Sequence, residues 1–168
     1  SKAFPQLYLS GFASLTREQE QSTEATVKEV IRRLRSYQTV DGSFSYWPGG
    51  TAPNAWGTVY AIHFLLEAEK KGYLVPEGMK RNALNDLSRI ARNWKPEASY
   101  SAESEEMTQA YRLFVLALGQ VAEVGAMNRL KESKTLMSMS RYLLAAGYAL
   151  VGRPDVSKEL VVKTTALT

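Results

Sequence analysis

The sequence contains no cysteine and a single histidine, His63. The absence of cysteine excludes disulfides, thiolate metal ligands, cysteine nucleophiles and any thioester formed within these 168 residues. His63 is then the only side chain that is a ready general base near neutral pH. Because it lies between Ile62 and Phe64 on an otherwise apolar stretch, we interpret it as a histidine at the edge of the core.

Long apolar runs and leader sequences are also missing. No stretch approaches the roughly 20 apolar residues of a membrane span, and no basic segment followed by an apolar one forms a signal peptide. The chain opens on Ser-Lys-Ala-Phe-Pro without a methionine, so we expect a piece of a longer protein whose targeting signal lies elsewhere. No Asp-rich box or Cys/His set has the spacing of a metal site. We therefore expect neither a metal nor a cofactor.

Charge is balanced and dispersed. Lys and Arg number 21 against 17 Asp and Glu, which gives a formal net charge of +4. The one basic concentration comprises Lys28, Arg32, Arg33 and Arg35, and on a helix these side chains spread around the polar side. They lack the interleaved aromatic residues of a nucleic-acid surface, so we interpret them as a solvated face. Hydrophobic residues make up 45% of the chain, enough for a core.

Apolar residues recur at helical spacing between glycine and proline stops, and no segment alternates as a strand does. Residues Ala3 to Leu9 have the pattern of a helix end closed by Gly11. Ser22 is predicted to cap the next helix, and Asn54 to cap a helix over Ala55–Lys71 with apolar residues on two sides. The first of these helices carries the stripe Val27, Val30, Ile31 and Leu34.

Further helices are predicted along the rest of the chain. One follows Pro76 and stops before Pro96, one ends at Gly119, and a short one surrounds Ala126–Lys131. The next ends at Gly152, and Pro154 opens the last. We expect an all-α chain of about seven or eight helices, forming part of an α/α toroid of helical hairpins. The stripe predicted for the helix before Gly152 is Leu136, Met139, Tyr142, Leu143, Ala146 and Leu150.

The loop after Tyr37 combines turn residues with aromatic residues. Asp41-Gly42, Pro48-Gly49 and Gly49-Gly50 predict turns. Phe44, Trp47 and Trp56 are the candidate binding residues, since the two tryptophans could line a pocket for a polyprenyl or sugar substrate. The competing interpretation, which we prefer, is structural: the loop is ordered, and Phe44 and Trp47 pack on helix ends near Trp56.

Three acidic residues are candidates for a catalytic pair. Glu103, Glu105 and Glu106 could suggest the two carboxylates of a glycoside hydrolase. Glu105 and Glu106 are adjacent and would point in different directions on a helix. A solvated, acid-rich helix start that complements the helix dipole is the simpler interpretation. We assign no catalytic residue, and no metal-ligating one.

Several of these segments together resemble a known family. The sequence has Gln38-x-x-Asp41-Gly42-Ser43-Phe44, a pattern similar to turns of terpene cyclases and of thioester domains. Around it lie, in order, Ser1 through Tyr8, Arg33-Leu34-x-x-Tyr37-Gln38, Trp56-x-Thr58-x-Tyr60-Ala61-x-x-Phe64-Leu65, Ala68, Gly72-Tyr73-x-Val75-Pro76 and Tyr111-x-x-x-Val115-Leu116-Ala117. This ordered series resembles the thioester domain of bacterial α2-macroglobulins over nearly the whole chain. Residues 1–168 are thus expected to be part of one such domain.

The resemblance implies a function as well as a fold. Members of this family are endopeptidase inhibitors that trap proteases: a bait region is cut, the molecule rearranges, and a thioester between a Cys and a Gln acylates the attacker. The segment Ser1 to Tyr8 resembles the one directly after the family's Cys-x-Glu-Gln motif, so the thioester is expected upstream. A protein that lacks the Cys and traps proteases without a covalent bond is the other possibility. His63 does not match the position of the histidine that assists thioester transfer in complement relatives.

The expected partners are target proteases and the other domains of the longer protein, with no nucleic acid or metal. The chain itself is not expected to be membrane-embedded, and the longer protein would be periplasmic or in the cell envelope, secreted or lipid-anchored. The alternatives are an α/α-toroid enzyme, of the terpene cyclase or glycoside hydrolase kind, or a non-covalent docking domain. No enzymatic activity is expected of the chain.

Overall fold

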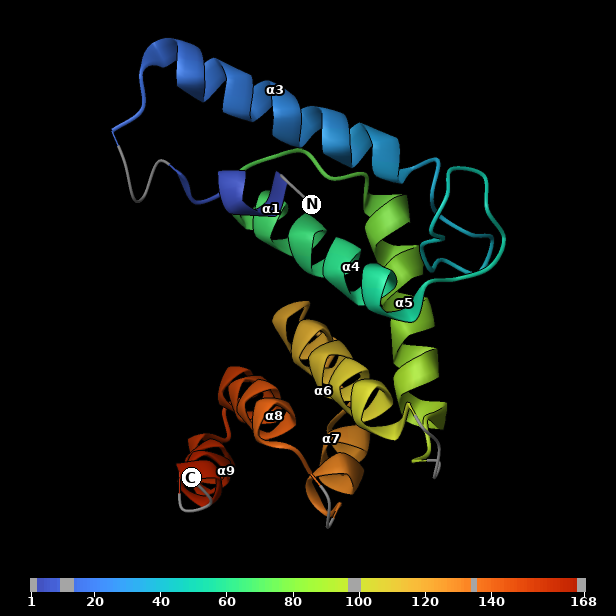
Figure 1. Cartoon of the computed structure of the whole chain (residues 1–168), viewed down its shortest axis with the longest axis vertical. Coiled ribbons are helices and arrows are strands. Elements are labelled where there is room, and N and C mark those ends of the chain that lie inside the picture. The colour runs from blue at the N-terminus through green and yellow to red at the C-terminus, as the bar shows by residue number, and fades with distance from the viewer. Residues whose placement is uncertain (1–2, 10–13, 97–100, 134–135, 166–168) are drawn as a thin grey trace. The chain divides into compact units, whose positions relative to one another are not determined.

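The computed structural model describes residues 3–9, 14–96, 101–133 and 136–165. Within these ranges the chain is helical, and the only sheet-like pairings are two isolated bridges, Gln38 with Phe44 and Ser45 with Pro53. The all-α prediction is confirmed. Figure 1 labels the eight described helices: α1 (Ala3–Gln6), α3 (Arg17–Leu34), α4 (Ala55–Lys70), α5 (Glu77–Asn93), α6 (Ala102–Leu118), α7 (Val124–Lys131), α8 (Ser138–Leu150) and α9 (Pro154–Thr165).

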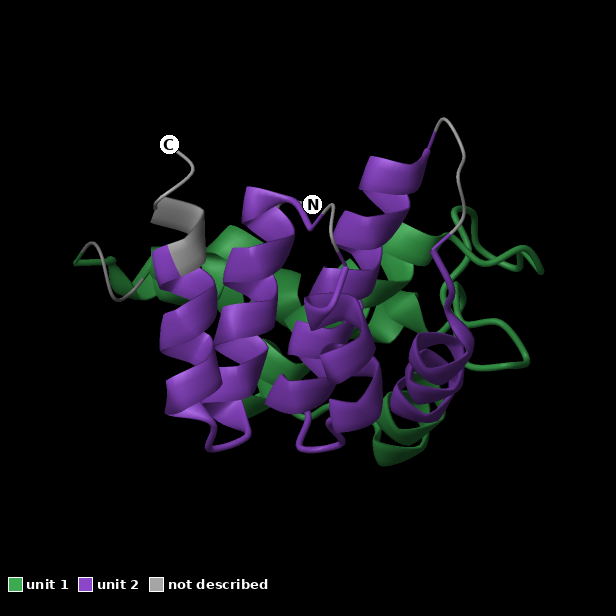
Figure 2. Ribbon diagram, turned by 90° about the horizontal axis from the view of Figure 1, so that it is seen from below, with its two compact units in different colours: residues 1–83 green, residues 84–168 purple. Residues whose placement is uncertain are grey.

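The chain divides into two compact units, residues 1–83 and 84–168 (Figure 2). The division falls inside α5, so this helix supplies its first part to unit 1 and its remainder to unit 2. Its apolar stripe is continuous, with Met79 and Ala83 buried in the first part and Leu84, Leu87 and Ala91 buried in the second. No described helix is both long and apolar enough to cross a membrane.

Helix α3 begins six residues earlier than predicted. Thr16 and not Ser22 is the N-cap: its hydroxyl accepts from the amide of Gln19 at 3.3 Å, and the Gln19 side chain accepts from the amide of Thr16 at 2.9 Å. This reciprocal capping box needs a Gln or Glu three residues after the cap, which Thr16 has and Ser22 lacks. Of the predicted stripe, Val27 and Ile31 are buried. The predicted closure at Gly11 lies outside the described residues.

Helix α4 is the apolar centre of unit 1. Asn54 caps it as predicted, because its side-chain oxygen accepts from the amide of Gly57 at 2.6 Å. One expected apolar side is buried throughout, and on the other Val59 and Ile62 are buried whereas Trp56 is exposed. Burial on two sides requires neighbours on both flanks. The buried residues are Thr58, Val59, Ala61, Ile62, Phe64, Leu65, Glu67 and Ala68.

In unit 2, α6 and α8 run parallel and pack along their length. Near their starts, the Glu106 carboxylate accepts from the amide of Met137 at 2.9 Å. Near their ends, Gly147 lies so close that a Cβ there would be 3.6 Å from the Cα of Phe114. Helix α9 packs on α8. Parallel helices linked by a shorter one are what repeated helical hairpins produce.

The predicted buried face of α8 is largely wrong, although Leu136, just before the helix, is buried. Met139, Tyr142 and Leu150 are exposed. The face that packs instead includes small residues, which let the backbones of α6 and α8 approach closely. The sequence pattern favoured the opposite face because larger apolar residues lie there. The buried residues are Ser140, Leu144, Ala145, Gly147 and Tyr148.

Candidate functional site

The turn that follows α3 is closed by side-chain as well as backbone hydrogen bonds. Gln38 Nε2 donates to the carbonyls of Gly42 at 3.1 Å and Met79 at 2.9 Å, which joins the turn to the start of α5. Gly42 has φ +108°, and a Cβ there would lie 2.3 Å from the carbonyl oxygen of Asn82. Only glycine fits this position, because any other residue would strain the backbone and clash with a fixed carbonyl.

Phe44 anchors the loop in the core of unit 1. Its side chain is 2% exposed, and its amide donates to the Thr58 hydroxyl oxygen at 2.9 Å. The Thr58 hydroxyl donates to the Phe44 carbonyl at 3.1 Å, and the amide of Asn54 donates to the same carbonyl at 2.8 Å. The prediction that Phe44 packs on a helix is confirmed. Its burial leaves it no surface for a ligand.

Trp47 does not pack, and the prediction that it does is wrong. Its side chain is 69% exposed, and its ring contacts that of Tyr46 edge-on with centroids 4.7 Å apart. Ser45 takes the inward place, where its hydroxyl oxygen lies 2.6 Å from the Trp47 carbonyl and 3.0 Å from the Tyr37 carbonyl, the two acceptors available to its one proton. Trp56, in the first turn of α4, is 45% exposed. The loop is ordered as predicted, but its tryptophans are on the surface.

His63 belongs to an aromatic cluster between α1 and α4. The Phe4 ring meets His63 edge-on at 4.9 Å between centroids, and lies 5.2 Å from Tyr60 and 6.1 Å from Phe64. His63 is half-buried, and this burial lowers its pKa, against the charge of Glu67. The interpretation of His63 as a core-edge residue is confirmed. Burial therefore favours the neutral form of the side chain.

A buried carboxylate next to this cluster also holds the residues that directly follow α1. The Tyr8 hydroxyl donates to Glu67, whose side chain lies among the buried residues of α4. Loss of solvent raises the pKa of Tyr8 to about 12, and the hydrogen bond and charge of Glu67 act in the same direction. Lys71 Nζ lies 4.9 Å from the centroid of the Tyr8 ring. Sequence reasoning missed this contact, although a glutamate on an apolar helix face was the available signal.

A groove of about 830 Å³ in unit 1 is bounded by α1, α3 and the segment after α4. Leu7 and Ile31 are its buried apolar lining. The Gln6 Oε1 atom on its wall is buried and has no hydrogen-bond partner among the described residues. Neither Phe44, Trp47 nor Trp56 lines it. The three predicted binding residues therefore do not converge on this groove.

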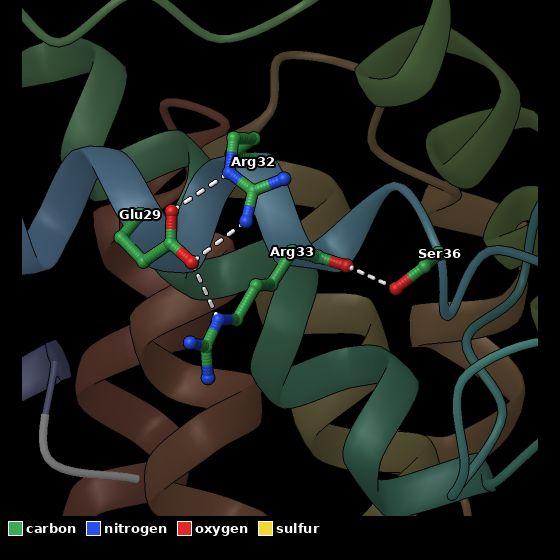
Figure 3. A network of polar contacts seen from close by, with 4 residues as sticks. All are labelled: Glu29, Arg32, Arg33 and Ser36. Atoms are coloured by element: carbon green, nitrogen blue, oxygen red, sulfur yellow. Dashed lines mark hydrogen bonds and ion pairs between the residues drawn. The ribbon is translucent and has the colours of Figure 1, made fainter.

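The basic concentration on α3 is a solvated face, as interpreted from the sequence. Figure 3 shows the Glu29 carboxylate accepting from Arg32 Nε at 2.7 Å, Arg32 Nη2 at 2.8 Å and Arg33 Nε at 2.6 Å. These hydrogen bonds lower the pKa of Glu29 to about 2. Lys28 is likewise paired with Glu24, at 2.5 Å. Pairing within one exposed helix leaves little positive charge for a polyanion.

Unit 2 buries charged groups that the sequence did not single out. Arg112 is buried, which lowers its pKa to about 10 although Asp86 opposes the shift. Arg112 donates to the Gln109 side chain, which in turn donates to the Ala91 carbonyl at 3.0 Å. Arg112 Nε has no partner among the described residues. These groups form a polar core of the unit.

The interpretation of all three glutamates at the start of α6 as solvated is wrong for one of them. Glu103 is exposed, but Glu106 is buried because it accepts from the amide of Met137 at the start of α8. It satisfies a helix N-terminus. No group of three or more His, Asp or Glu that could hold a metal ion occurs among the residues with described positions.

The relatives found by comparing amino-acid sequences are all α2-macroglobulins or their homologues. An α2-macroglobulin of Escherichia coli strain K12 is 27% identical over 166 residues, which is 94% of this chain and 10% of that protein. An α2-macroglobulin of Xylella fastidiosa strain Temecula1 is 31% identical over 129 residues, 73% of this chain and 8% of that protein. The chain thus spans about a tenth of the length of these relatives. No family model matches the chain.

Solved structures show the same fold. Escherichia coli α2-macroglobulin activated by porcine elastase aligns with a TM-score of 0.82 at 23% identity, over 96% of this chain and 15% of that one. Salmonella α2-macroglobulin reacted with methylamine aligns with a TM-score of 0.79 at 24% identity, over 96% of this chain and 11% of that one. The helical order found here is therefore shared with a region of these proteins.

Proposed function

This chain is homologous to a region of the bacterial α2-macroglobulins, and we propose that it is part of the thioester-type domain of a protease-trapping inhibitor. The observation that carries the proposal is the match over 94% of the chain to one such protein. The shared fold, at TM-scores of 0.79 to 0.82, supports it. On this proposal the chain has a structural and positioning role and no enzymatic activity.

We propose further that residues 1–168 form part of one α/α toroid. Support comes from the parallel packing of α6 and α8, with α7 returning between them. In a toroid of helical hairpins, alternate helices run in the same direction. Helix α9 packs on α8, as the following helix of the next hairpin in a toroid would.

The chemistry proposed for the longer protein needs a thioester between a cysteine and a glutamine side chain. This chain has no cysteine, and its first eight residues resemble the segment after the Cys-x-Glu-Gln motif, so the reactive motif would lie upstream of Ser1. The helix after the motif must then be held in place. Phe4 does this by packing against Tyr60, His63 and Phe64, and Tyr8 by its hydrogen bond to Glu67.

The partners we propose are target proteases and the remaining domains of the longer protein. One structural relative is described as trypsin activated and another as activated by porcine elastase. On the same proposal the longer protein belongs to the periplasm or cell envelope. Its anchoring would reside outside these residues.

The test compares the isolated chain with the longer protein that contains it. Each is incubated with labelled methylamine, then with trypsin or elastase, and separated on denaturing gels. The longer protein is expected to incorporate methylamine and to form a covalent adduct with the protease, since a thioester is attacked by amines. The isolated chain is expected to do neither.

The outcomes separate the alternatives. A longer protein that has the Cys-x-Glu-Gln motif but never forms an adduct would contradict the covalent trap. A longer protein without the motif that still retains active protease in a complex would indicate a non-covalent trap. Turnover of a polyprenyl or oligosaccharide substrate by the isolated chain would indicate an enzyme instead.

A further inference from the structure

The loop after Tyr37 places two large aromatic side chains in solvent. Tyr46 is 67% exposed and Trp47 is 69% exposed. Pro48 and Pro53 are also exposed, and the bridge between Ser45 and Pro53 brings the two arms of the loop together. We call Tyr46, Trp47, Pro48 and Pro53 the aromatic loop surface. These side chains contribute little to the core of unit 1.

The aromatic loop surface is held by backbone hydrogen bonds although its side chains are exposed. The Ser45 amide donates to the Tyr37 carbonyl at 2.8 Å, the Gly49 amide to the Ser36 carbonyl at 2.7 Å, and the Gly50 amide to the Trp47 carbonyl at 3.1 Å. Phe44, buried beneath, fixes the strand-like segment from which Tyr46 and Trp47 project. A contact made by preordered aromatic side chains loses little conformational entropy, which is why such residues dominate binding surfaces.

The lack of charged residues around the aromatic loop surface indicates the chemistry of its partner. Residues 42–66 contain no Asp, Glu, Lys or Arg, although 23% of the chain is charged. A strongly charged partner would find no complementary charge within this segment. An uncharged, apolar surface would cover Tyr46 and Trp47 without leaving buried charges unpaired.

We propose that the aromatic loop surface docks on an uncharged, apolar surface of another domain of the same longer polypeptide. The chain spans only 10% and 8% of the two relatives described above, so most of such a protein is available to provide the partner. This proposal shares one premise with the proposed function, namely that the chain is one part of a longer protein. It does not depend on a thioester or on protease binding.

Hydroxyl-radical footprinting with mass spectrometry tests this directly, because it reads the solvent exposure of individual Tyr and Trp side chains. We expect Tyr46 and Trp47 to be oxidised several-fold more slowly in the longer protein than in the isolated chain. Phe44, buried in the chain itself, should react slowly in both. Equal oxidation of Tyr46 and Trp47 in the two proteins would overturn the proposal.

A pair of substitutions provides the second measurement. Tyr46→Ser combined with Trp47→Ser is expected to leave the thermal midpoint of the isolated chain unchanged and to lower that of the longer protein. The matched control is Leu74→Ser, which removes a side chain that is 93% exposed elsewhere in unit 1. This substitution should leave the thermal midpoints of both the isolated chain and the longer protein unchanged. A shift of the same size for the control and the double variant would contradict a contact specific to the loop.

Two other occupants are distinguished in the same experiments. If light scattering shows the isolated chain to be a dimer whose Tyr46 and Trp47 are protected, the surface binds a second copy. If an oligosaccharide protects these residues in the isolated chain while they stay exposed in the longer protein, the surface binds sugar. Either result overturns the interdomain contact. A failed methylamine reaction would leave the footprint unaffected, so the two proposals fail separately.

Discussion

At the scale of residues, Phe44 and Trp47 show how neighbouring aromatic side chains in one loop take opposite roles. Phe44→Ala is expected to destabilise the chain by about 3–5 kcal/mol, because it empties a buried site. Trp47→Ala, at an exposed site, should change the free energy of unfolding by only about 0.5 kcal/mol or less. Urea unfolding followed by far-UV circular dichroism measures both. A larger loss for Trp47 than for Phe44 would mean that the loop packs differently.

The pKa of His63 can be measured by NMR without overlap from other histidine signals, since it is the only histidine. Its Hε1 resonance should titrate with a midpoint below the ordinary value of 6.5, because burial lowers its pKa. Below pH 6.5 the unfolded chain takes up this proton first. The stabilising effect of the neutral ring is therefore present above pH 6.5 and lost as the pH falls through the midpoint of the folded state.

Glu67 supplies the control for that titration. Its charge raises the pKa of His63 against the effect of burial, so Glu67→Gln should lower the midpoint further. A midpoint at or above 6.5 in the unmodified chain would contradict the buried position of His63. A rise on substitution would contradict the assigned effect of Glu67.

The residue roles differ in how far the sequence predicts them. Its apolar neighbours indicate the partly buried position of His63. The position of Trp47 could not be predicted in this way. The aromatic and turn residues around it are equally compatible with a loop that packs on the core and with one that is exposed to solvent. The choice depends on which side chain fills the site beside Thr58, and Ser45 and Phe44 fill the inward positions. Arg112 is buried by tertiary contacts that no local pattern contains. For Glu67 the only signal was its position on an apolar helix face.

At the scale of elements, the start of α4 gives a prediction with a defined cause. Asn54→Ala removes the acceptor for the Gly57 amide and should cost about 1 kcal/mol of folding free energy. Asn54→Ser, which keeps a capping oxygen, should cost much less. Urea midpoints of the two variants measure the difference. Equal losses would mean that the side chain acts through something other than capping.

Helix ends are largely predictable from the sequence and helix faces less so. Asn54, Gly119 and Pro154 mark boundaries correctly, because caps and breakers act within a few residues. The predicted start of α3 is too late because it depends on Ser22, whereas the complete capping box lies at Thr16. The face of α8 depends on how closely α6 approaches, and the small residue Gly147, which permits that approach, carries no hydrophobic signal.

At the scale of the whole molecule, the unit boundary inside α5 predicts the effect of truncation. Residues 1–83 retain only the first part of this helix, a length at which helices are marginal without further packing. This fragment should have a lower urea midpoint than residues 1–96, which retain all of α5. Circular dichroism of the two fragments measures it. Equal midpoints would show that unit 1 does not need the second part of α5.

The aromatic loop surface has a consequence for cleavage. Between Arg35 and Lys70 the chain contains neither lysine nor arginine, the residues that an acidic specificity pocket of the trypsin kind accepts. The aromatic loop surface thus offers such enzymes no cleavage site, whatever its accessibility. The fragment from Ser36 to Lys70 should therefore leave a digest with a trypsin-like enzyme in one piece.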